Sequence, residues 1–290
     1  MRRYELSDAQ WQRIANLFPH LRHHGGRGHP YNPHRPIVQG ILWILHSGAP
    51  WRDLPERYGP WPTVYRRFNT WRRDGTWNKI LTRLLYRLDH KGRIRHDLWC
   101  IDATIIRATR AAAGARRHNR HRSHLGGTAA TQLDEPADHA LGRCRGGFST
   151  KVHLVVDGNG LVLAVWLSPG QRNDSKGFEP VLHRVQLPRG RGKRRWPLRL
   201  AGDKGYSFPG LRRWLKRRRV EAVIPQRSDQ RKRHELPLNK KIYKKRNIIE
   251  RVIGWYKECR RLVTRFEKLA VNYLAFWIVA MMEKVLKKHL

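Results

Sequence analysis

The feature that most constrains the fold is a short, dense apolar run, LWCIDATII, at residues 98–106. Runs of this length and composition are typical of a strand that is buried on both faces of a sheet. Asp102 stands in the middle of the run. Because a buried carboxylate without a partner is costly, Asp102 must be hydrogen-bonded, paired with a cation or bound to a metal ion. A structural aspartate satisfied by arginine or backbone groups remains the alternative to a functional one.

A second acid follows a later strand. Residues 198–201 read as a short strand, and Asp203 comes directly after it between two glycines, in GDKG. In open sheets of this type, functional groups gather beyond the carboxyl ends of the strands. We therefore expect Asp203 at that edge, with a solvated turn aspartate as the alternative.

The order of elements after residue 93 predicts the type of sheet. The first strand is followed by a hairpin with the turn Asp157-Gly158-Asn159-Gly160, because such a sequence favours a tight reversal between two strands. Helices then alternate with the remaining strands. The expected elements are strands at 150–156, 161–167, 198–201 and 221–224, and helices beginning near 173–175 and at 208–219, 243–257 and 268–287. This is the element order of a ribonuclease-H-like mixed sheet flanked by helices.

A third acid lies on one of these helices. The stretch YKKRNIIERVIGWYK (243–257) has apolar residues at helical spacing. At about 100° per residue, four polar side chains fall on one stripe of this helix: Tyr243, Arg246, Glu250 and Lys257. In isolation the Arg246–Glu250 pair would be a solvated ion pair that stabilises the helix by only about 0.3 kcal/mol.

The three carboxylates together predict a cation site. Asp102, Asp203 and Glu250 would supply the hard oxygen ligands that Mg²⁺ or Mn²⁺ prefers, with phosphate and water completing the coordination. Two such ions about 4 Å apart can hold both the attacking and the leaving oxygen of a phosphoryl transfer. No covalent protein nucleophile is then required.

Residues 1–92 predict a helical domain separate from residues 93–290. Ser7 and Gln10 form a capping box before a first helix, and a second helix spans about 35–47. A short helix at 51–58, a Gly59-Pro60 break and a helix at 62–73 resemble a helix-turn-helix, and a further helix covers 77–88. The alternative is a helical packing module with a basic face. The candidate DNA-reading residues are Tyr65, Arg66, Arg67, Asn69, Arg72 and Arg73.

The charge of the chain points to a polyanionic partner. Lys and Arg number 61 against 22 Asp and Glu, a net charge of +39. No apolar stretch is long enough to span a membrane, and the N-terminus lacks an apolar signal-peptide region. The three cysteines are far apart and form no zinc or disulfide pattern. We expect nucleic acid in the cytoplasm as the partner.

The segment 107–146 lacks periodicity and is dense in Gly, Arg and His, so we expect a mobile basic loop. Its histidines, His118, His121 and His124, are an alternative metal site that the pattern disfavours, because no cysteine lies near them and arginine surrounds them. Asp157 is most simply a turn residue. Asn173, Asp174 or Ser175 would cap the helix that follows the hairpin, with a catalytic Asp174 as the alternative.

Four blocks in order resemble the DDE transposases of bacterial insertion sequences, in the insertion-sequence-five family. They are IDAT with Asp102, the hairpin GFSTKVHLVVDGNGLVLAVWLSPGQRNDS, AGDKGYS with Asp203, and the spacing of Tyr243, Arg246, Glu250 and Lys257. The N-terminal GILWILHSGAPWRDLPERYGPWPTVYRRFNTW resembles the DNA-binding region of the same family.

The resemblance implies a metal-binding catalytic triad of Asp102, Asp203 and Glu250. Arg246 and Lys257 would contact DNA phosphate or help to position Glu250, with Tyr243 in support. The implied activity is cleavage of terminal inverted-repeat ends, followed by joining of the 3′-OH to double-stranded target DNA, with two Mg²⁺ or Mn²⁺ ions. Because two ends must be joined, we expect a homodimer or larger assembly on DNA. The alternatives are a metal-dependent nuclease on the same fold and an inactive DNA-binding remnant.

Overall fold

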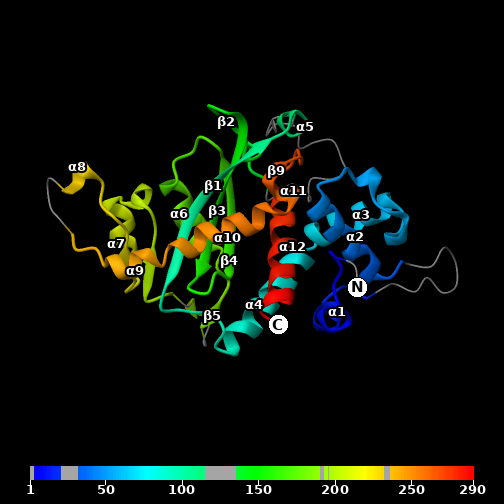
Figure 1. The fold of residues 1–290 in the computed structure, drawn as a ribbon, viewed down its shortest axis with the longest axis horizontal. Coiled ribbons are helices and arrows are strands. Elements are labelled where there is room, and N and C mark those ends of the chain that lie inside the picture. The colour runs from blue at the N-terminus through cyan, green and yellow to red at the C-terminus, as the bar shows by residue number, and fades with distance from the viewer. Residues whose placement is uncertain (1–2, 21–31, 115–134, 190–192, 195, 232–235) are drawn as a thin grey trace, which may run out of the picture.

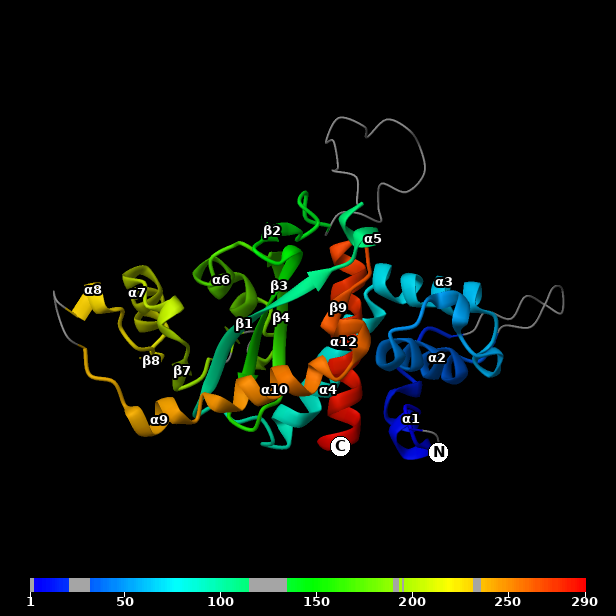
Figure 2. The same cartoon turned by 45° about the horizontal axis from the view of Figure 1, so that its top comes forward.

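The computed structural model describes residues 3–20, 32–114, 135–189, 193–194, 196–231 and 236–290. A bundle of helices at the N-terminus lies beside a mixed sheet covered by helices (Figures 1 and 2). The helices of the bundle are α1 (Asp8–Ala15), α2 (His34–Ser47), α3 (Trp61–Arg73) and α4 (Thr76–His90). Residues 115–134 of the predicted mobile loop, which include the three histidines at 118, 121 and 124, lie outside the described residues.

The elements after residue 93 follow the predicted order. The strands are β1 (Trp99–Ala108), β2 (Gly142–Cys144), β3 (Gly147–Asp157), β4 (Val162–Pro169), β7 (Arg199–Ala201), β8 (Glu221–Val223) and β9 (Thr264–Arg265), with a separate pair β5 (Pro188–Arg189) and β6 (Lys193–Arg194). The helices are α5 (Arg110–Ala113), α6 (Ser175–His183), α7 (Pro209–Arg217), α8 (Ser228–Arg231), α9 (Lys240–Lys244), α10 (Asn247–Lys257), α11 (Arg260–Val263) and α12 (Ala270–Lys288).

The main sheet has the topology expected of a ribonuclease-H-like domain. β1 pairs antiparallel with β3, and β3 pairs antiparallel with β4. On its other side β1 pairs parallel with β7, which in turn pairs parallel with β8. The order across the sheet is therefore β4-β3-β1-β7-β8, with the strand that carries Asp102 in the centre. The short strands β2 and β9 extend the sheet beside β3 and β1.

The C-terminal helix joins the bundle to the sheet. α12 contacts β4 on one side and α2, α3 and α4 on the other, and it stands between the two regions in both ribbon views (Figures 1 and 2). Phe276 of α12 stacks on Phe68 of α3 with ring centroids 4.6 Å apart. Trp277 is fully buried, as are Trp71 and Trp77 of the bundle. Burial of aromatic groups this large makes one continuous apolar core of the two regions.

The N-terminal region is helical as predicted, but one predicted helix is wrong. Residues 51–58 form two single 3₁₀ turns, Trp51–Asp53 and Glu56–Tyr58. The cause is Pro55, which lacks an amide hydrogen and would clash with the preceding turn of an α-helix. The capping box is confirmed: Ser7 Oγ accepts from the Gln10 amide, and the Gln10 side chain accepts from the Ser7 amide.

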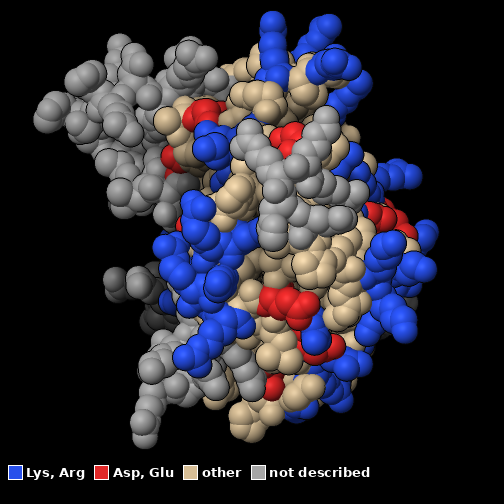
Figure 3. Space-filling view, turned by 90° about the vertical axis from the view of Figure 1, so that its left-hand side faces the viewer, with Lys and Arg blue, Asp and Glu red and all other residues tan. Residues whose placement is uncertain are grey.

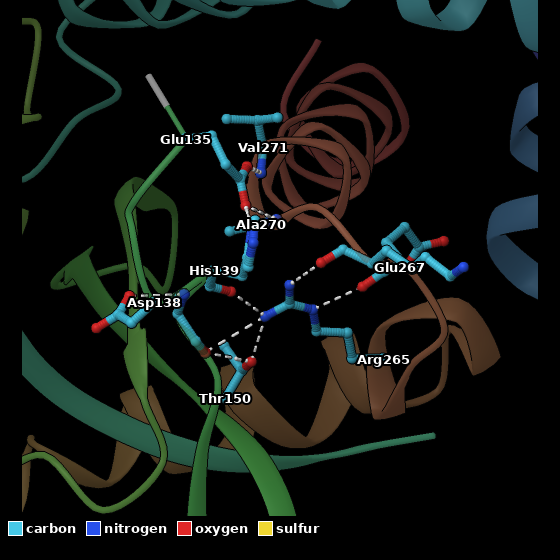
Figure 4. A network of polar contacts seen from close by, with 10 residues as sticks. Glu135, Asp138, His139, Thr150, Arg265, Glu267, Ala270 and Val271 are labelled. Carbon is cyan, nitrogen blue, oxygen red and sulfur yellow. Dashed lines mark hydrogen bonds and ion pairs between the residues drawn. The ribbon is translucent and has the colours of Figure 1, made fainter. Parts of the chain in front are cut away.

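The segment 107–146 is more ordered at its ends than the sequence predicted. Its first residues extend β1 and form α5, and Gly142–Cys144 form β2. Near its end, Glu135 caps α12 by accepting from the amides of Ala270 and Val271 (Figure 4). A loop prediction from composition misses these elements, because pairing with β3 and capping of α12 are tertiary contacts.

A buried arginine holds this segment in place. Arg265 has no solvent-exposed surface, and it donates to the carbonyls of His139, Glu267 and Lys268 and to Thr150 Oγ1. Figure 4 shows its guanidinium at the centre of this network. Each buried carbonyl thereby gains a partner, and the residues around 139 are fixed to the joint between α11 and α12.

Candidate functional site

The strand register places the first two acids side by side. In the parallel pair of β1 and β7, Cys100 lies opposite Ala201. Asp102 and Asp203 each stand two residues beyond that pair, at the carboxyl edge of β7. Gly202 lets the backbone pass close to its neighbours there, because an added Cβ would come within 3.1 Å of both Ile101 and Tyr206.

Asp102 is held between the backbone and an arginine. The Ala103 amide donates to its Oδ1 at 2.8 Å, and Arg246 Nη1 donates to its Oδ2 at 2.8 Å. Burial raises the pKa of this carboxyl, Arg246 opposes that rise, and the nearby charge of Asp203 adds to it. The Asp102 carboxylate is therefore a group whose charge is costly without a cation beside it.

Arg246 connects this strand to the third acid. Its Nη2 donates to Glu250 Oε1 at 2.5 Å, while its Nη1 contacts Asp102. The arginine side chain is 13% exposed and that of Glu250 is 54% exposed. One guanidinium thus bridges an acid in the middle of the sheet and an acid on the covering helix, with Glu250 facing solvent.

The helix that carries Glu250 differs from the predicted continuous one. It is divided into α9 and α10, and Lys245 and Arg246 lie between them. The amides of these two residues bond to carbonyls three residues earlier, a tighter pattern than that of an α-helix. Arg246 therefore stands at the start of α10, from which its side chain reaches β1.

Asp203 begins a 3₁₀ turn. Its Oδ1 accepts from the Gly205 amide at 2.8 Å and so caps Lys204–Tyr206. Tyr206 is fully buried, and its hydroxyl has no hydrogen-bond partner within the described part of the chain. Burial raises the pKa of Tyr206 well above its ordinary value, and the charges of Asp174, Asp102 and Asp203 raise it further. Sequence reasoning missed this hydroxyl, although its spacing of three residues from Asp203 places it in the same turn.

The supporting residues lie on the same two helices. The guanidinium of Arg246 lies 5.9 Å from the ring centroid of Tyr243, which packs against the core. Lys257 lies two turns beyond Glu250, near the end of α10. No ion pair joins Lys257 to any of the three acids, all of which the structure describes.

The donor set fits hard divalent cations, although the acids do not yet surround a common point. Among the described residues, no three His, Cys, Asp or Glu side chains are placed to hold one ion. The guanidinium of Arg246 lies between two of the acids, Asp102 and Glu250. A cluster of carboxylates that already requires a positive charge is chemically suited to Mg²⁺ or Mn²⁺.

The remaining candidate acids are structural in their contacts. Asp157 is fully buried, and its carboxylate accepts from the amides of Arg95, Asn159 and Leu161. Asp174 pairs with Lys151 at 2.7 Å. Asp157 is held by the hairpin turn, and neither Asp157 nor Asp174 bonds to Arg246.

The candidate DNA-reading residues of α3 differ in their exposure. Tyr65, Arg66 and Arg73 are exposed. Asn69 is 8% exposed and donates to the Tyr65 carbonyl of its own helix, so its amide does not face solvent. Arg67 contacts His34 and the Asn32 carbonyl, and Arg72 is partly buried. Glycines with positive φ stand on both sides of α3: Gly59 at the predicted break before it and Gly75 at the turn after it. The helix-turn-helix assignment stays a prediction.

Basic side chains spread widely over the surface. Figure 3 shows Lys and Arg across the face that carries α7, α8 and α9, with a small group of Asp and Glu near its middle.

Within the described residues, no helix is both long and apolar enough to cross a membrane.

Comparison with known proteins gives two family matches along the chain. Residues 6–81 match a family described as "Putative transposase of IS4/5 family", and residues 94–282 match the "Transposase DDE domain" family. An uncharacterised protein of Sinorhizobium fredii, y4sN, is 39% identical over 112 residues, which are 39% of this chain and 83% of that protein. The "Putative transposase for insertion sequence element IS402" of Burkholderia cepacia is 36% identical over 131 residues, which are 44% of this chain and 58% of that protein.

Solved transposase structures give weaker matches. The crystal structure of a pre-cleavage Mos1 transpososome is 12% identical, covers 83% of this chain and 80% of that one, and has a TM-score of 0.26. Because this TM-score is low, the sheet topology is assigned from the strand pairing of this chain alone. Since the DDE-domain match spans most of the chain, and the blocks with Asp102, Asp203 and Glu250 lie inside it, the chain belongs to the DDE transposase family of insertion sequences.

Proposed function

We propose that this DNA transposase cleaves the ends of its element at terminal inverted repeats and joins each freed 3′-OH to target DNA. The observation that carries the proposal is the bridge of Arg246 between Asp102 on β1 and Glu250 on α10, beside Asp203. Acids far apart in the sequence converge there around one positive charge. A purely structural ion pair would need only one carboxylate as the partner of Arg246.

Asp102, Asp203 and Glu250 would hold two Mg²⁺ or Mn²⁺ ions. These ions would supply Lewis-acid stabilisation of the charge that develops on the reacting phosphate. The amide of Ala103 donates to Asp102 Oδ1, and that of Gly205 donates to Asp203 Oδ1. Each bond fixes one carboxylate oxygen and thereby also the direction of the second. Glu250, on a helix and largely exposed, is the acid with the most freedom to change rotamer.

Arg246 balances the acids in the structure, and the cations would replace it in that role. Asp102 would otherwise be a partly buried charge next to a second carboxylate. With the acids neutralised in this way, the Arg246 guanidinium would be free to bind a DNA phosphate, for which its planar donors are well suited. Lys257 lies further along the same helix and would extend this phosphate contact. Tyr243 would support Arg246 through its ring.

Double-stranded DNA is the proposed partner, both at the inverted repeats and at the target. The net charge of +39 provides strong, salt-dependent attraction to phosphate. On α3, the exposed residues Tyr65, Arg66 and Arg73 are the ones we propose for DNA contact, with the helical residues 1–92 as the DNA-binding domain and residues 93–290 as the catalytic domain. Joining two ends requires two active sites, so we propose a homodimer or larger assembly on DNA, in the bacterial cytoplasm with the nucleoid.

The test is an assay with labelled inverted-repeat ends, a supercoiled target plasmid and Mg²⁺. We expect joined product from the wild type and none from Asp203→Asn. Glu221→Gln is the matched control, because it removes the same charge from an exposed surface pair with Arg199. Nicked ends without joined product would favour a nuclease on the same fold. If the wild type and Asp203→Asn both bind DNA and neither cuts it, an inactive DNA-binding remnant would be favoured.

A further inference from the structure

One glycine of the helix that carries Glu250 is not explained by the fold. Gly254 lies in the interior of α10, where glycine is unfavourable because it loses more backbone freedom on folding than any other residue. Its backbone is helical, without the positive φ that would call for glycine. A Cβ added to it would meet no atom of the described residues within 4 Å, so close packing does not require glycine either. Gly210 of α7 is also exposed, but it stands in the first turn of its helix rather than in the interior.

Glycines inside two other helices show what a packing requirement looks like. A Cβ on Gly40 of α2 would come within 2.9 Å of the Cβ of Tyr58, and one on Gly177 of α6 would overlap the ring of His153. Tyr58 and His153 are both buried, so neither side chain can move aside. These glycines let their helices pack closely on the rest of the chain. Gly254 is exposed, so the space above it lies outside the protein.

That space adjoins the candidate site. α10 lies across the sheet between α9 and α11 (Figures 1 and 2). At about 100° and about 1.5 Å per residue, Gly254 lies about 40° around the helix from Glu250 and about 6 Å beyond it. Lys257 follows about 4.5 Å further along and about 60° around. Val252 and Tyr256, on the opposite side of the helix, are buried. Gly254 therefore leaves open space between the proposed catalytic acid and the lysine.

The side chains around this space suit a phosphate backbone. Arg251 is exposed and Lys257 partly exposed. Lys288 of α12 is exposed as well, and its Nζ lies 4.2 Å from the ring centroid of Trp255, which is 36% exposed. These three cations outnumber Glu258, the exposed acid one turn beyond Gly254. The exposed face of α10 carries no apolar side chain besides Trp255, whereas the centre of a protein–protein interface is apolar.

We propose that the DNA backbone beside the scissile phosphate crosses α10 at Gly254, in the space that a side chain would fill. Glu250 would face the scissile phosphate on one side, and Lys257 would hold a neighbouring phosphate on the other. Glycine allows a ligand to approach the protein backbone closely. Gly254 is thus a positioning residue, which sets how near the DNA lies to the acids. This role rests on the proposed function, because it takes DNA at Glu250 as the substrate.

The first test adds side chains of increasing size at this position and measures the rate of strand transfer at saturating DNA. Gly254→Ala should reduce the rate about tenfold and Gly254→Leu about 100-fold, because moving a substrate by about 1 Å is enough for such a loss. Gly254→Ala should also unfold about 2 °C above the wild type, because alanine favours the helix. A fall in rate together with a rise in unfolding temperature would not come from misfolding.

Glu179→Leu is the matched control, because it places the same side chain on an exposed helix elsewhere. Glu179 belongs to α6, whose Gly177 packs on His153. His153 lies opposite Ala103 in the sheet and so shares its face, which is the reverse of the face that carries Asp102. The rate of strand transfer should stay that of the wild type.

The second test detects the contact directly, without measuring activity. Gly254→Cys is combined with Cys144→Ser, since Cys100 and Cys259 are buried. The DNA is an element end that carries a thiol tether, activated as a mixed disulfide, on the phosphate next to the scissile one. We expect a disulfide-linked protein–DNA adduct for Gly254→Cys and none for Glu179→Cys in the same background.

A wild-type rate for Gly254→Leu, or equal adduct yields at positions 254 and 179, would overturn the role of Gly254. The wild type would still join DNA ends in that case, and the proposed function would stand. A wild type that joins no ends would overturn the proposed function itself. If Gly254→Leu lowers the mass of the DNA-free protein in light scattering, this face of α10 contacts a second copy of the chain, and the proposed DNA contact is wrong.

Discussion

Two arginines, Arg246 and Arg265, each hold distant segments of this chain together, and they do so with different partners. Arg265 is fully buried and donates to four main-chain carbonyls, those of His139, Ala140, Glu267 and Lys268, and to Thr150. Arg246 is partly buried, and both of its hydrogen bonds go to carboxylates, those of Asp102 and Glu250. The first network joins neutral acceptors, and the second joins charged ones at the edge of solvent.

The pKa values of the two guanidiniums shift in opposite directions, in keeping with these partners. Burial lowers the pKa of Arg265, since its acceptors are mostly neutral. Burial also acts to lower the pKa of Arg246, but the charge and hydrogen bond of Asp102 outweigh it and raise that pKa. Anionic carboxylates attract divalent cations more strongly than neutral carbonyls do, so the contacts of Arg246 are the ones that a metal cation could take over. This difference separates a structural network from a site.

The largest expected effect is on activity, from Asp102→Asn. Losing one carboxylate of the proposed triad should remove about 4 kcal/mol of transition-state stabilisation, a roughly thousandfold fall in strand-transfer rate. The free energy of unfolding should change by only about 1 kcal/mol, because Asn can still accept from Arg246 or the Ala103 amide. Rates of joined-product formation and urea unfolding measure the two. An active Asp102→Asn would contradict the distinction between the networks.

Next in size is Arg265→Met, which should lower the free energy of unfolding by about 3–5 kcal/mol. It leaves the buried carbonyls of His139 and Glu267 without a donor. Arg66→Met on the exposed face of α3 is the control and should change stability by less than about 0.5 kcal/mol. Equal unfolding midpoints in urea for the two variants would show that the Arg265 network is not structural.

A smaller effect, dependent on pH, is expected for Glu283→Gln. Glu283 of α12 is 3% exposed and bonds to His46 of α2 and to Lys287. Burial acts to raise its pKa, but His46 and Lys287 outweigh it and hold that pKa below 4.5. Since the folded-state pKa is depressed, the carboxylate stabilises the fold above about pH 4.5, and this stabilisation is lost as pH falls through the lower value.

The variant should therefore lose about 2 kcal/mol of stability at pH 7, and the difference from wild type should shrink as the pH is lowered below 4.5. Urea unfolding of both proteins across this range gives the difference directly. A difference that stays constant with pH would mean that the Glu283 charge is not the stabilising group.

The smallest effect on stability is expected from Arg246→Gln. In EDTA the variant should lose only about 1 kcal/mol, since Glu250 is exposed and Asp102 retains a backbone donor. Added Mg²⁺ should raise its unfolding temperature more than that of the wild type, because no guanidinium then competes for the acids. A loss as large as that from Arg265→Met, with no response to Mg²⁺, would remove the contrast on which the site assignment depends.

Several elements could be predicted because their causes are local. Ser7 and Gln10 satisfy each other and the first amides of α1, so the start of that helix is encoded within four residues. The turn at Asp157 closes through bonds to Asn159 and Leu161, again within a few residues. The predictions failed where a proline or a distant partner intervened. Pro55 breaks the expected helix at 51–58, and the break before α10 coincides with the reach of Arg246 to a strand more than a hundred residues earlier.

Local patterns predict the main strands and helices, the apolar strand around Asp102 and the spacing of the three acids, because alternation, periodicity and capping depend on near neighbours. Long-range packing places Arg246 between Asp102 and Glu250, buries Asn69, and brings aromatic residues of α3 and α12 around a cavity. These features depend on where segments far apart in the chain meet. Packing of α12 against both the sheet and the bundle fixes those meetings, and no local pattern encodes them.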